Sequence, residues 1–160
     1  MNAVVVILMG SRSDMNHAAS IVEALGEYGI TADLRIGSAH KTPAHVLKIL
    51  EEYEADPRPK VYITIAGRSN ALSGFVDAQV NAPVIACPPV SSTFAGADIY
   101  SSLRMPSGVA PAVVLDPGGA ALLAAKILGL QSPEIQNKVA DKRREYVDKI
   151  VQDDSEVEGQ

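Results

Sequence analysis

Apolar and polar positions divide this chain into short, continuously apolar runs separated by segments of helical periodicity. Continuous apolar runs predict strands that are buried on both faces, as in a parallel sheet. Five such strands are predicted, at residues 4–9, 32–36, 61–65, 84–87 and 109–115. A helix is predicted after each strand, over 15–25, 46–53, 71–79, 97–103 and 120–130. The alternation predicts an α/β protein, a three-layer αβα sandwich around a five-stranded parallel sheet with flavodoxin-like strand order.

The chain after residue 132 has a different pattern. Ser132-Pro133 begins a last helix over 133–151, whose thin apolar stripe predicts packing on a neighbouring subunit. Residues 152–160 are predicted to be disordered. The preceding helix is rich in alanine between 119 and 125, which predicts close helix contacts and suggests a subunit interface. We therefore expect a homo-oligomer.

The composition excludes several classes of partner. The net charge is −5, there is no tryptophan and aromatic residues make up 4% of the chain, so nucleic acid is not an expected partner. The longest apolar stretches, such as 3–9, are about a third of the length of a membrane helix, so no membrane partner is expected. Cys87 is the sole cysteine, and the N-terminus lacks the charged start of a signal peptide. These features predict a cytoplasmic protein in which Cys87 is buried and inert.

Polar residues follow three of the predicted strands, in the segments 10–14, 38–41 and 66–70. The carboxyl ends of parallel strands meet at one edge of a sheet, so these segments are expected to lie together. Their glycines and serines let the backbone approach a phosphate, lysine or arginine can neutralise it, and Asp14 can accept hydrogen bonds from sugar hydroxyls. Each segment alone also suits a short strand-to-helix turn. The three together favour a binding site for a phosphorylated ligand.

His40 and Lys41 are the candidate catalytic pair. They precede a helix whose start is predicted by Thr42 as N-cap and Pro43 at the first helical position. The positive end of the helix dipole and the Lys41 charge favour a neutral imidazole, which can accept a proton near pH 7. A lone histidine at such a place can also simply cap a helix or pack in a loop. The neighbouring polar segments favour the acid/base role.

Several familiar chemistries have no motif in this sequence. It contains no Gly-rich phosphate loop ending in Gly-Lys-Ser/Thr, no dinucleotide fingerprint and no His-Glu-x-x-His helix. His17, His40 and His45 do not have metal-ligand spacing, so no metal is expected. Ala66 stands where a phospho-acceptor domain would carry aspartate at the end of its third strand.

Four motifs resemble those of the phosphoribosylaminoimidazole carboxylases of purine biosynthesis. They span Met9–Asp14, Ser38–Pro43, Ala66–Gly74 and Asp98–Gly108. The resemblance covers about residues 3–130, so 1–132 is interpreted as an α/β carboxylase domain. The bacterial mutases of this family typically carry a histidine where this chain has Ala71, and usually an arginine at the position of Lys41. The chain is therefore similar to the direct carboxylase branch, as in the animal bifunctional enzyme, with the mutase as the alternative.

The resemblance implies that carbon dioxide is added to aminoimidazole ribonucleotide without ATP, biotin, metal or another cofactor. It implies that His40 is the acid/base and that Lys41 helps to frame the carbon dioxide. The implied substrate-binding residues are Ser11, Ser13 and Asp14 at the ribose phosphate, Ser38 and Ala39 around the ribonucleotide, Ala66, Gly67 and Ser69 at the carbon dioxide, and Arg68 and Asn70 in the same loop. A tetramer or octamer is implied for the assembly. A noncatalytic nucleotide-binding domain is the third interpretation.

Overall fold

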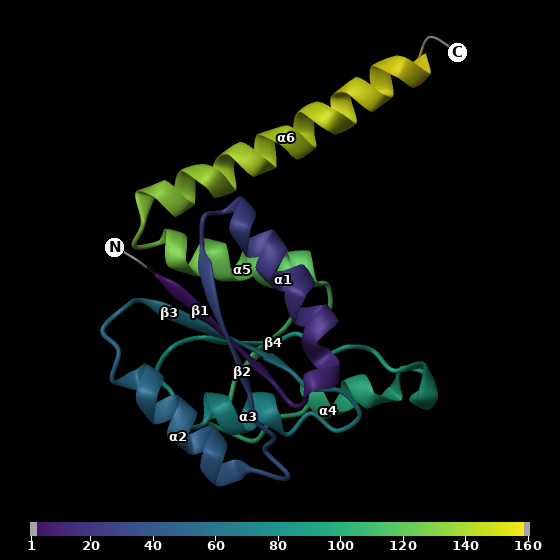
Figure 1. The fold of residues 1–160 in the computed structure, drawn as a ribbon. Helices are drawn as coiled ribbons and strands as arrows, with labels where there is room; N and C mark the ends of the chain where they lie inside the picture. The colour runs from purple at the N-terminus through teal and green to yellow at the C-terminus, as the bar shows by residue number, and fades with distance from the viewer. Residues whose placement is uncertain (1–2, 159–160) are drawn as a thin grey trace.

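A parallel sheet runs through the middle of the computed structural model, which describes residues 3–158 (Figure 1). Its strands are β1 (Val4–Met9), β2 (Thr31–Ile36), β3 (Lys60–Ile65), β4 (Val84–Ala86) and β5 (Ala112–Val113). The strand order is β2-β1-β3-β4-β5, and every neighbouring pair is parallel. The predicted five-stranded sheet and its flavodoxin-like order are confirmed.

Helices cover both faces of the sheet (Figure 1). Helices α1 and α5 lie above it in this view and α2, α3 and α4 lie below it. Their bounds are α1 Met15–Glu27, α2 Pro43–Glu54, α3 Leu72–Asp77, α4 Tyr100–Leu103 and α5 Pro117–Gly129. The last helix, α6 (Pro133–Glu158), leaves α5 and runs away from the body of the molecule. This arrangement confirms the predicted three-layer αβα sandwich.

Strand β1 divides the core into two halves. All six of its residues are buried, and alternate side chains face opposite layers. Val5, Ile7 and Met9 pack on the side of α1 and α5, whereas the residues between them pack on the side of α2 and α3. Full burial of one such aliphatic side chain stabilises the fold by about 1.5 to 3 kcal/mol. Burial on both faces is therefore confirmed for this strand.

Strand β2 departs from that prediction because it is the edge of the sheet. Leu34 and Ile36 are each 40% exposed. Asp33 and Arg35 alternate with them, so the strand lacks the continuous apolar run of β1. The prediction of burial on both faces is wrong for β2.

Strand β5 is also shorter than the predicted 109–115. Proline has no amide hydrogen to donate to a sheet, and Pro111 precedes the strand. The amide of Ala110 donates to the Asp77 carboxylate at 2.7 Å instead of to a strand. Pro111 and the Ala110 contact therefore keep the strand from beginning before Ala112, and the residues paired with β4 are Ala112 and Val113.

The alanine-rich helix α5 lies inside this chain's own core. Ala120, Ala121, Ala124 and Ala125 are fully buried, and the helix packs against α1. Gly129, at the end of α5, packs closely against α6. A Cβ there would lie 3.3 Å from the Gln136 amide nitrogen, which is a tight contact. The close helix contacts are as predicted, and those of the four alanines form within the chain.

Helix α6 contacts the body of the molecule through its first three turns. Ile135 is buried against the core, Val139 packs beside it, and Lys142 pairs with Glu27 at 3.2 Å. The prediction of disorder is wrong for 152–158, which continue the helix; residues 159–160 lie outside the described part. The physical reason is pairing at i,i+4 spacing, from Lys149 to Asp153 and from Gln152 to Glu156, without an interrupting glycine or proline. Within residues 3–158, no helix combines the length and apolar character needed to cross a membrane.

Cys87 follows β4 and is fully buried, as predicted. Its Sγ lies 3.4 Å from His17 Nε2 and 3.7 Å from the Leu115 carbonyl oxygen. Burial, with a smaller contribution from the Asp116 charge, raises the pKa of the Cys87 thiol to about 12. The thiolate is the reactive form, so this thiol is chemically protected in the folded protein.

We expect Cys87 to resist iodoacetamide in the native protein at pH 8 and to react completely in denaturant. The pKa near 12 keeps the buried thiol protonated at pH 8, whereas an unfolded thiol near pKa 8.5 is partly ionised. Mass spectrometry before and after denaturation measures the labelled fraction. Rapid labelling of folded protein would contradict the buried environment.

Candidate active site

A cavity of about 590 Å³ opens at the carboxyl edge of the sheet. The loops that follow β1, β2, β3 and β4 all contribute to its wall. Its lining residues are Gly10, Ser11, Ser13, Asp14, Ser38, His40, Lys41, Ala66, Gly67, Arg68, Ser69, Pro89, Val90 and Ser91. Parallel pairing brings these loops together, because it places every strand's carboxyl end at the same edge.

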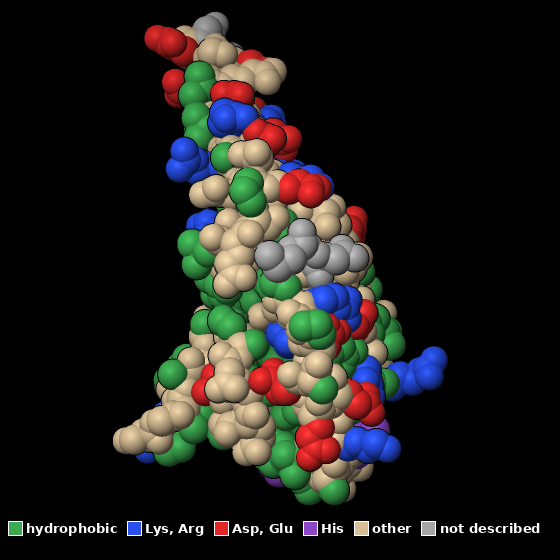
Figure 2. Space-filling model, turned by 90° about the vertical axis from the view of Figure 1, so that its left-hand side faces the viewer, with side chains coloured by type: hydrophobic (Ala, Val, Ile, Leu, Met, Phe, Trp, Pro, Cys, Tyr) green, Lys and Arg blue, Asp and Glu red, His purple; other side chains and the backbone are tan. Residues whose placement is uncertain are grey.

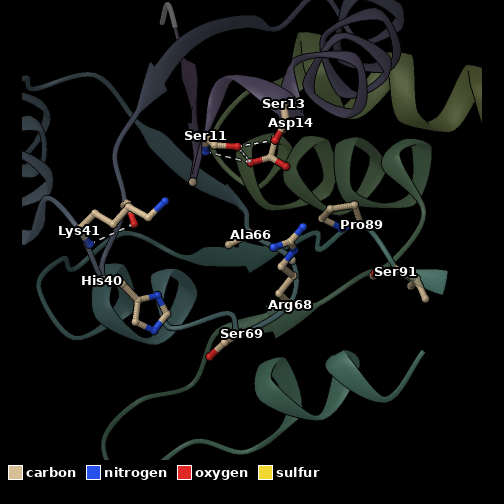
Figure 3. A pocket seen from close by; sticks show the side chains of 14 residues that line it. Ser11, Ser13, Asp14, His40, Lys41, Ala66, Arg68, Ser69, Pro89 and Ser91 are labelled. Carbon is tan, nitrogen blue, oxygen red and sulfur yellow. Dashed lines mark hydrogen bonds between the residues drawn. The ribbon is translucent and has the colours of Figure 1, made fainter. Parts of the chain in front are cut away.

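The polar side chains are distributed around this cavity (Figure 3). His40 and Lys41 lie on one side, Ser91 lies on the opposite side, and the Arg68 side chain extends between them. Lys41 and Arg68 are its two basic lining residues, and Asp14 is its one acidic lining residue. The local charge therefore favours an anionic ligand, although the whole chain carries a net charge of −5.

The loop after β1 presents hydroxyl and carboxylate groups in a fixed turn. The Ser11 amide donates to the Asp14 carboxylate at 3.0 Å, and the Ser11 and Ser13 hydroxyl oxygens lie 2.5 Å apart. A short 3-10 turn, Arg12–Asp14, leads directly into α1. This turn places Ser11, Ser13 and Asp14 beside the start of a helix, where its free amides favour an anion.

The loop after β2 fixes the backbone of His40 and Lys41. The Ser38 amide donates to Thr42 Oγ1 at 3.0 Å, and the Lys41 amide donates to the Ser38 hydroxyl at 3.2 Å. Helix α2 begins at Pro43, as predicted, but the Thr42 hydroxyl bonds back to Ser38 instead of capping the helix. The resulting tight turn leaves both the imidazole and the ammonium group exposed to the cavity.

Gly37 allows the chain to enter that turn. A Cβ at this position would lie 2.8 Å from Val46 Cγ2, closer than carbon atoms can pack. The glycine therefore lets β2 end directly against α2, and this close packing sets where the His40 turn begins.

The loop after β3 contains a backbone conformation that is unusual for its residue. Arg68 has φ of 61°, in the left-handed region that favours glycine. Its amide donates to the Asp98 carboxylate at 3.3 Å. The left-handed turn directs the Arg68 side chain into the cavity (Figure 3), beside Ala66 and Ser69.

Two of the predicted site residues do not line the cavity. Ala39 is partly buried and packs with the core beneath α2. Asn70 is 3% exposed, and its side chain donates to the Ser102 hydroxyl and accepts from the Ser73 amide. Asn70 therefore makes structural hydrogen bonds within the protein. The other ten predicted residues line the cavity.

Pro89, Val90 and Ser91 also line the cavity but were not among the predicted residues. They follow the carboxyl end of β4, so the rule applied to the first three strands would also have found them. The fourth segment was not predicted because it begins with Pro88-Pro89, which end the strand but carry no polar side chain. Gly10 belongs to the motif after β1 and also lines the cavity.

The described part of the chain, residues 3–158, contains no group of three or more histidine, cysteine, aspartate or glutamate side chains placed to hold a metal. His17, His40 and His45 are separated in the fold: His17 bonds to the Cys87 carbonyl oxygen at 3.1 Å, and His45 is exposed on α2. His40 is the one histidine that lines the cavity.

Curated relatives match nearly the whole chain. A phosphoribosylaminoimidazole carboxylase of Treponema denticola is 59% identical over 98% of this chain and 99% of the relative. One from Archaeoglobus fulgidus is 54% identical over 88% of this chain and 79% of its own. A human bifunctional phosphoribosylaminoimidazole carboxylase/phosphoribosylaminoimidazole succinocarboxamide synthetase is 44% identical over 84% of this chain, which spans 32% of that longer protein.

A solved structure shows the same fold. The crystal structure of Treponema denticola PurE superposes with a TM-score of 0.95 at 60% identity, covering 96% of this chain and 98% of that one. The family model described as AIR carboxylase matches residues 4–149. The chain belongs to the AIR carboxylase family.

Proposed function

We propose that this protein adds carbon dioxide directly to the imidazole ring of aminoimidazole ribonucleotide. The observation that carries the proposal is the placement of His40 and Lys41 in one cavity with the Ser11–Asp14 loop. Carboxylase relatives that match almost the full length support the reaction class. Acid/base, cationic and phosphate-binding groups are thus available within one site.

The ribonucleotide is proposed to lie between the loops after β1 and β2. Ser11 and Ser13 offer hydroxyl groups to the phosphate, and Asp14 can accept hydrogen bonds from the ribose. Ser38, which lines the cavity in the loop after β2, is proposed to contact the sugar. This orientation directs the imidazole ring towards His40.

The carboxylation needs little covalent help from the protein. The amino group makes the adjacent ring carbon an enamine-like nucleophile, which forms a carbon–carbon bond with carbon dioxide. The ring carbon then holds both a hydrogen and the new carboxylate. His40 accepts that proton, the C–H electron pair restores the aromatic ring, and the proton passes to solvent. The products are carboxyaminoimidazole ribonucleotide and one proton, and positioning supplies much of the rate.

Lys41 and the loop after β3 are proposed to hold the carbon dioxide. Negative charge develops on its oxygens as the bond forms, so a fixed ammonium group stabilises the transition state. The Ser69 hydroxyl and the backbone at Ala66 and Gly67 line the same wall. The Arg68 side chain extends into the same cavity and adds a second cation there.

The mutase, which would move a carboxylate from the exocyclic amine to the ring carbon, is the alternative. Ala71 carries no acid/base group and does not line the cavity. It borders a separate hollow of about 420 Å³ beside the same loop. These features favour free carbon dioxide as the substrate.

Parallel initial-rate assays without ATP separate the two reactions. One uses aminoimidazole ribonucleotide with excess carbon dioxide, and the other uses freshly prepared N-carboxyaminoimidazole ribonucleotide. We expect the faster turnover with free carbon dioxide. Preferential use of the N-carboxy compound would establish the mutase instead.

We expect His40→Asn to lower kcat by about two to four orders of magnitude while the ribonucleotide still binds. Asparagine keeps a polar side chain of similar reach but cannot accept the ring proton near neutral pH. Stopped assays give kcat, and calorimetric titration with the ribonucleotide gives its Kd.

His45→Asn is the matched control, because His45 is an exposed histidine on α2 that does not line the cavity. This variant should retain its activity. Unchanged turnover in His40→Asn would remove the acid/base assignment and favour a noncatalytic binding domain.

We also propose that the projecting part of α6 packs on a second copy of this chain, within a tetramer or octamer. Tyr146, Val147, Ile150 and Val151 are between 55% and 68% exposed, at spacings that place them along one side of the helix. Figure 2 shows apolar side chains between charged ones on this projecting helix. A second copy would remove this apolar surface from water.

Charge placed on that apolar side should disrupt the assembly. We expect the double variant Val147→Lys, Ile150→Lys to have a lower mass in light scattering than the wild-type oligomer of 16.8 kDa chains. Asp148→Lys, at an exposed position between them, reverses one charge and so makes the same change in net charge without removing apolar surface; it should leave the mass unchanged. An unaltered oligomer in the double variant would place the interface elsewhere.

A further inference from the structure

The segment 98–102 has no assigned role in the proposed reaction, although it belongs to the fourth sequence motif. It forms a short 3-10 turn and the start of α4, outside the wall of the main cavity. Three of its side chains, Asp98, Ser101 and Ser102, bond to the loop that follows β3. These contacts span about thirty positions in sequence and join two separate loops.

Two of the contacts are made to backbone amides. The Arg68 amide donates to Asp98 Oδ2 at 3.3 Å, and the Asn70 amide donates to Ser101 Oγ at 2.9 Å. Ser101 in turn donates its hydroxyl hydrogen to the Asp98 carbonyl oxygen at 2.7 Å, which leaves its oxygen free to accept from Asn70. Each of the three donor hydrogens therefore has its own acceptor, and the Ser101 hydroxyl serves once as donor and once as acceptor.

The third contact locks a buried side chain. Asn70 Nδ2 donates to Ser102 Oγ at 2.9 Å, and Asn70 Oδ1 accepts from the Ser73 amide at 3.1 Å. Asn70 and Ser102 are 3% and 1% exposed, so water does not compete for these bonds. The carboxyl end of the loop is therefore fixed at the start of α3.

The loop needs such restraint because Arg68 is in the left-handed region, with φ of 61°. An L-residue with a side chain adopts this conformation only where its surroundings determine it. Asp98 accepts from the amide of that same residue. Its other carboxylate oxygen, Oδ1, is buried and lacks a hydrogen-bond partner within the described residues. Burial of this unpaired acceptor lowers the folding stability.

We propose that Asp98, Ser101 and Ser102 are positioning residues, which hold residues 67–70 in the shape that forms the carbon dioxide side of the cavity. They touch neither the cavity nor the proposed reacting atoms, and they act through the backbone of Arg68 and Asn70. The kinetic consequence rests on the proposed carboxylase function. The restraint on the loop does not depend on it.

Three variants and one control test this role. Asp98→Ala removes the acceptor for the Arg68 amide, Asp98→Asn restores an acceptor without charge, and Ser101→Ala removes the acceptor for the Asn70 amide. Ser107→Ala is the control, because Ser107 is exposed in the same motif and makes none of these bonds. Thermal unfolding of each variant identifies any that fail to fold.

The first readout is hydrogen–deuterium exchange in peptides that span 66–71, which needs no substrate. We expect exchange at least about tenfold faster in Asp98→Ala and about fivefold faster in Ser101→Ala. Asp98→Asn should recover most of the wild-type protection, and Ser107→Ala should match the wild type. Wild-type exchange in folded Asp98→Ala and Ser101→Ala would overturn the proposal.

The second readout separates the two substrates. We expect KM for carbon dioxide to rise about fivefold to tenfold in Asp98→Ala, while the Kd for aminoimidazole ribonucleotide changes less than twofold. The β1 loop, which is proposed to bind the phosphate, is not part of these contacts. An equal loss for both substrates, or a failure of Asp98→Asn to recover, would contradict a positioning role.

The two proposals fail in different ways. If the wild type does not carboxylate aminoimidazole ribonucleotide, the proposed function is wrong, and the exchange experiment still decides whether residues 98–102 restrain the loop. If the wild type is active but loop exchange is unaffected by Asp98→Ala, the restraint is absent and the carboxylase function stands.

Discussion

Burial of β1 between two helical layers is the constraint on which the rest of the molecule depends. All six of its residues are removed from water, and its pairing with β2 and β3 is in continuous parallel register. Parallel pairing fixes the direction of every strand, so the loops at their carboxyl ends must meet. The apolar core therefore determines where the polar chemistry is assembled, although no core side chain takes part in it.

The loops that form the site are held in place by different kinds of contact. The β1 loop is closed by its own hydrogen bonds, and the β2 loop by the contact between Ser38 and Thr42. The loop after β3 is instead tied to a distant segment through Asp98 and Ser101. The shapes of the first two loops are thus determined locally, whereas that of the loop after β3 depends on tertiary structure.

This difference explains how much could be predicted from the sequence. Strands β1 and β3, the helix start at Pro43 and the meeting of three loops follow from local patterns, which the structure reproduces. The inward turn of Asn70 could not be predicted, because it depends on Ser102, 32 positions away. The half-exposed β2 does follow from the predicted strand order, which places it at the edge, but not from the rule that short apolar runs are buried on both faces. The helical end of α6 reflects an ion pair and a side-chain hydrogen bond at i,i+4 spacing, which an expectation of disorder at the chain end overlooked.

The left-handed backbone at Arg68 affects how this position must be studied. A replacement there can alter two quantities, the charge offered to the cavity and the free-energy cost of the left-handed backbone conformation. Alanine removes the cation and keeps the conformational penalty, whereas glycine removes both. The difference between these two variants isolates the backbone contribution, and lysine, which keeps the charge, isolates the geometry of the guanidinium group. At Arg68 an alanine substitution alone therefore reports on the side chain and leaves the backbone contribution unmeasured.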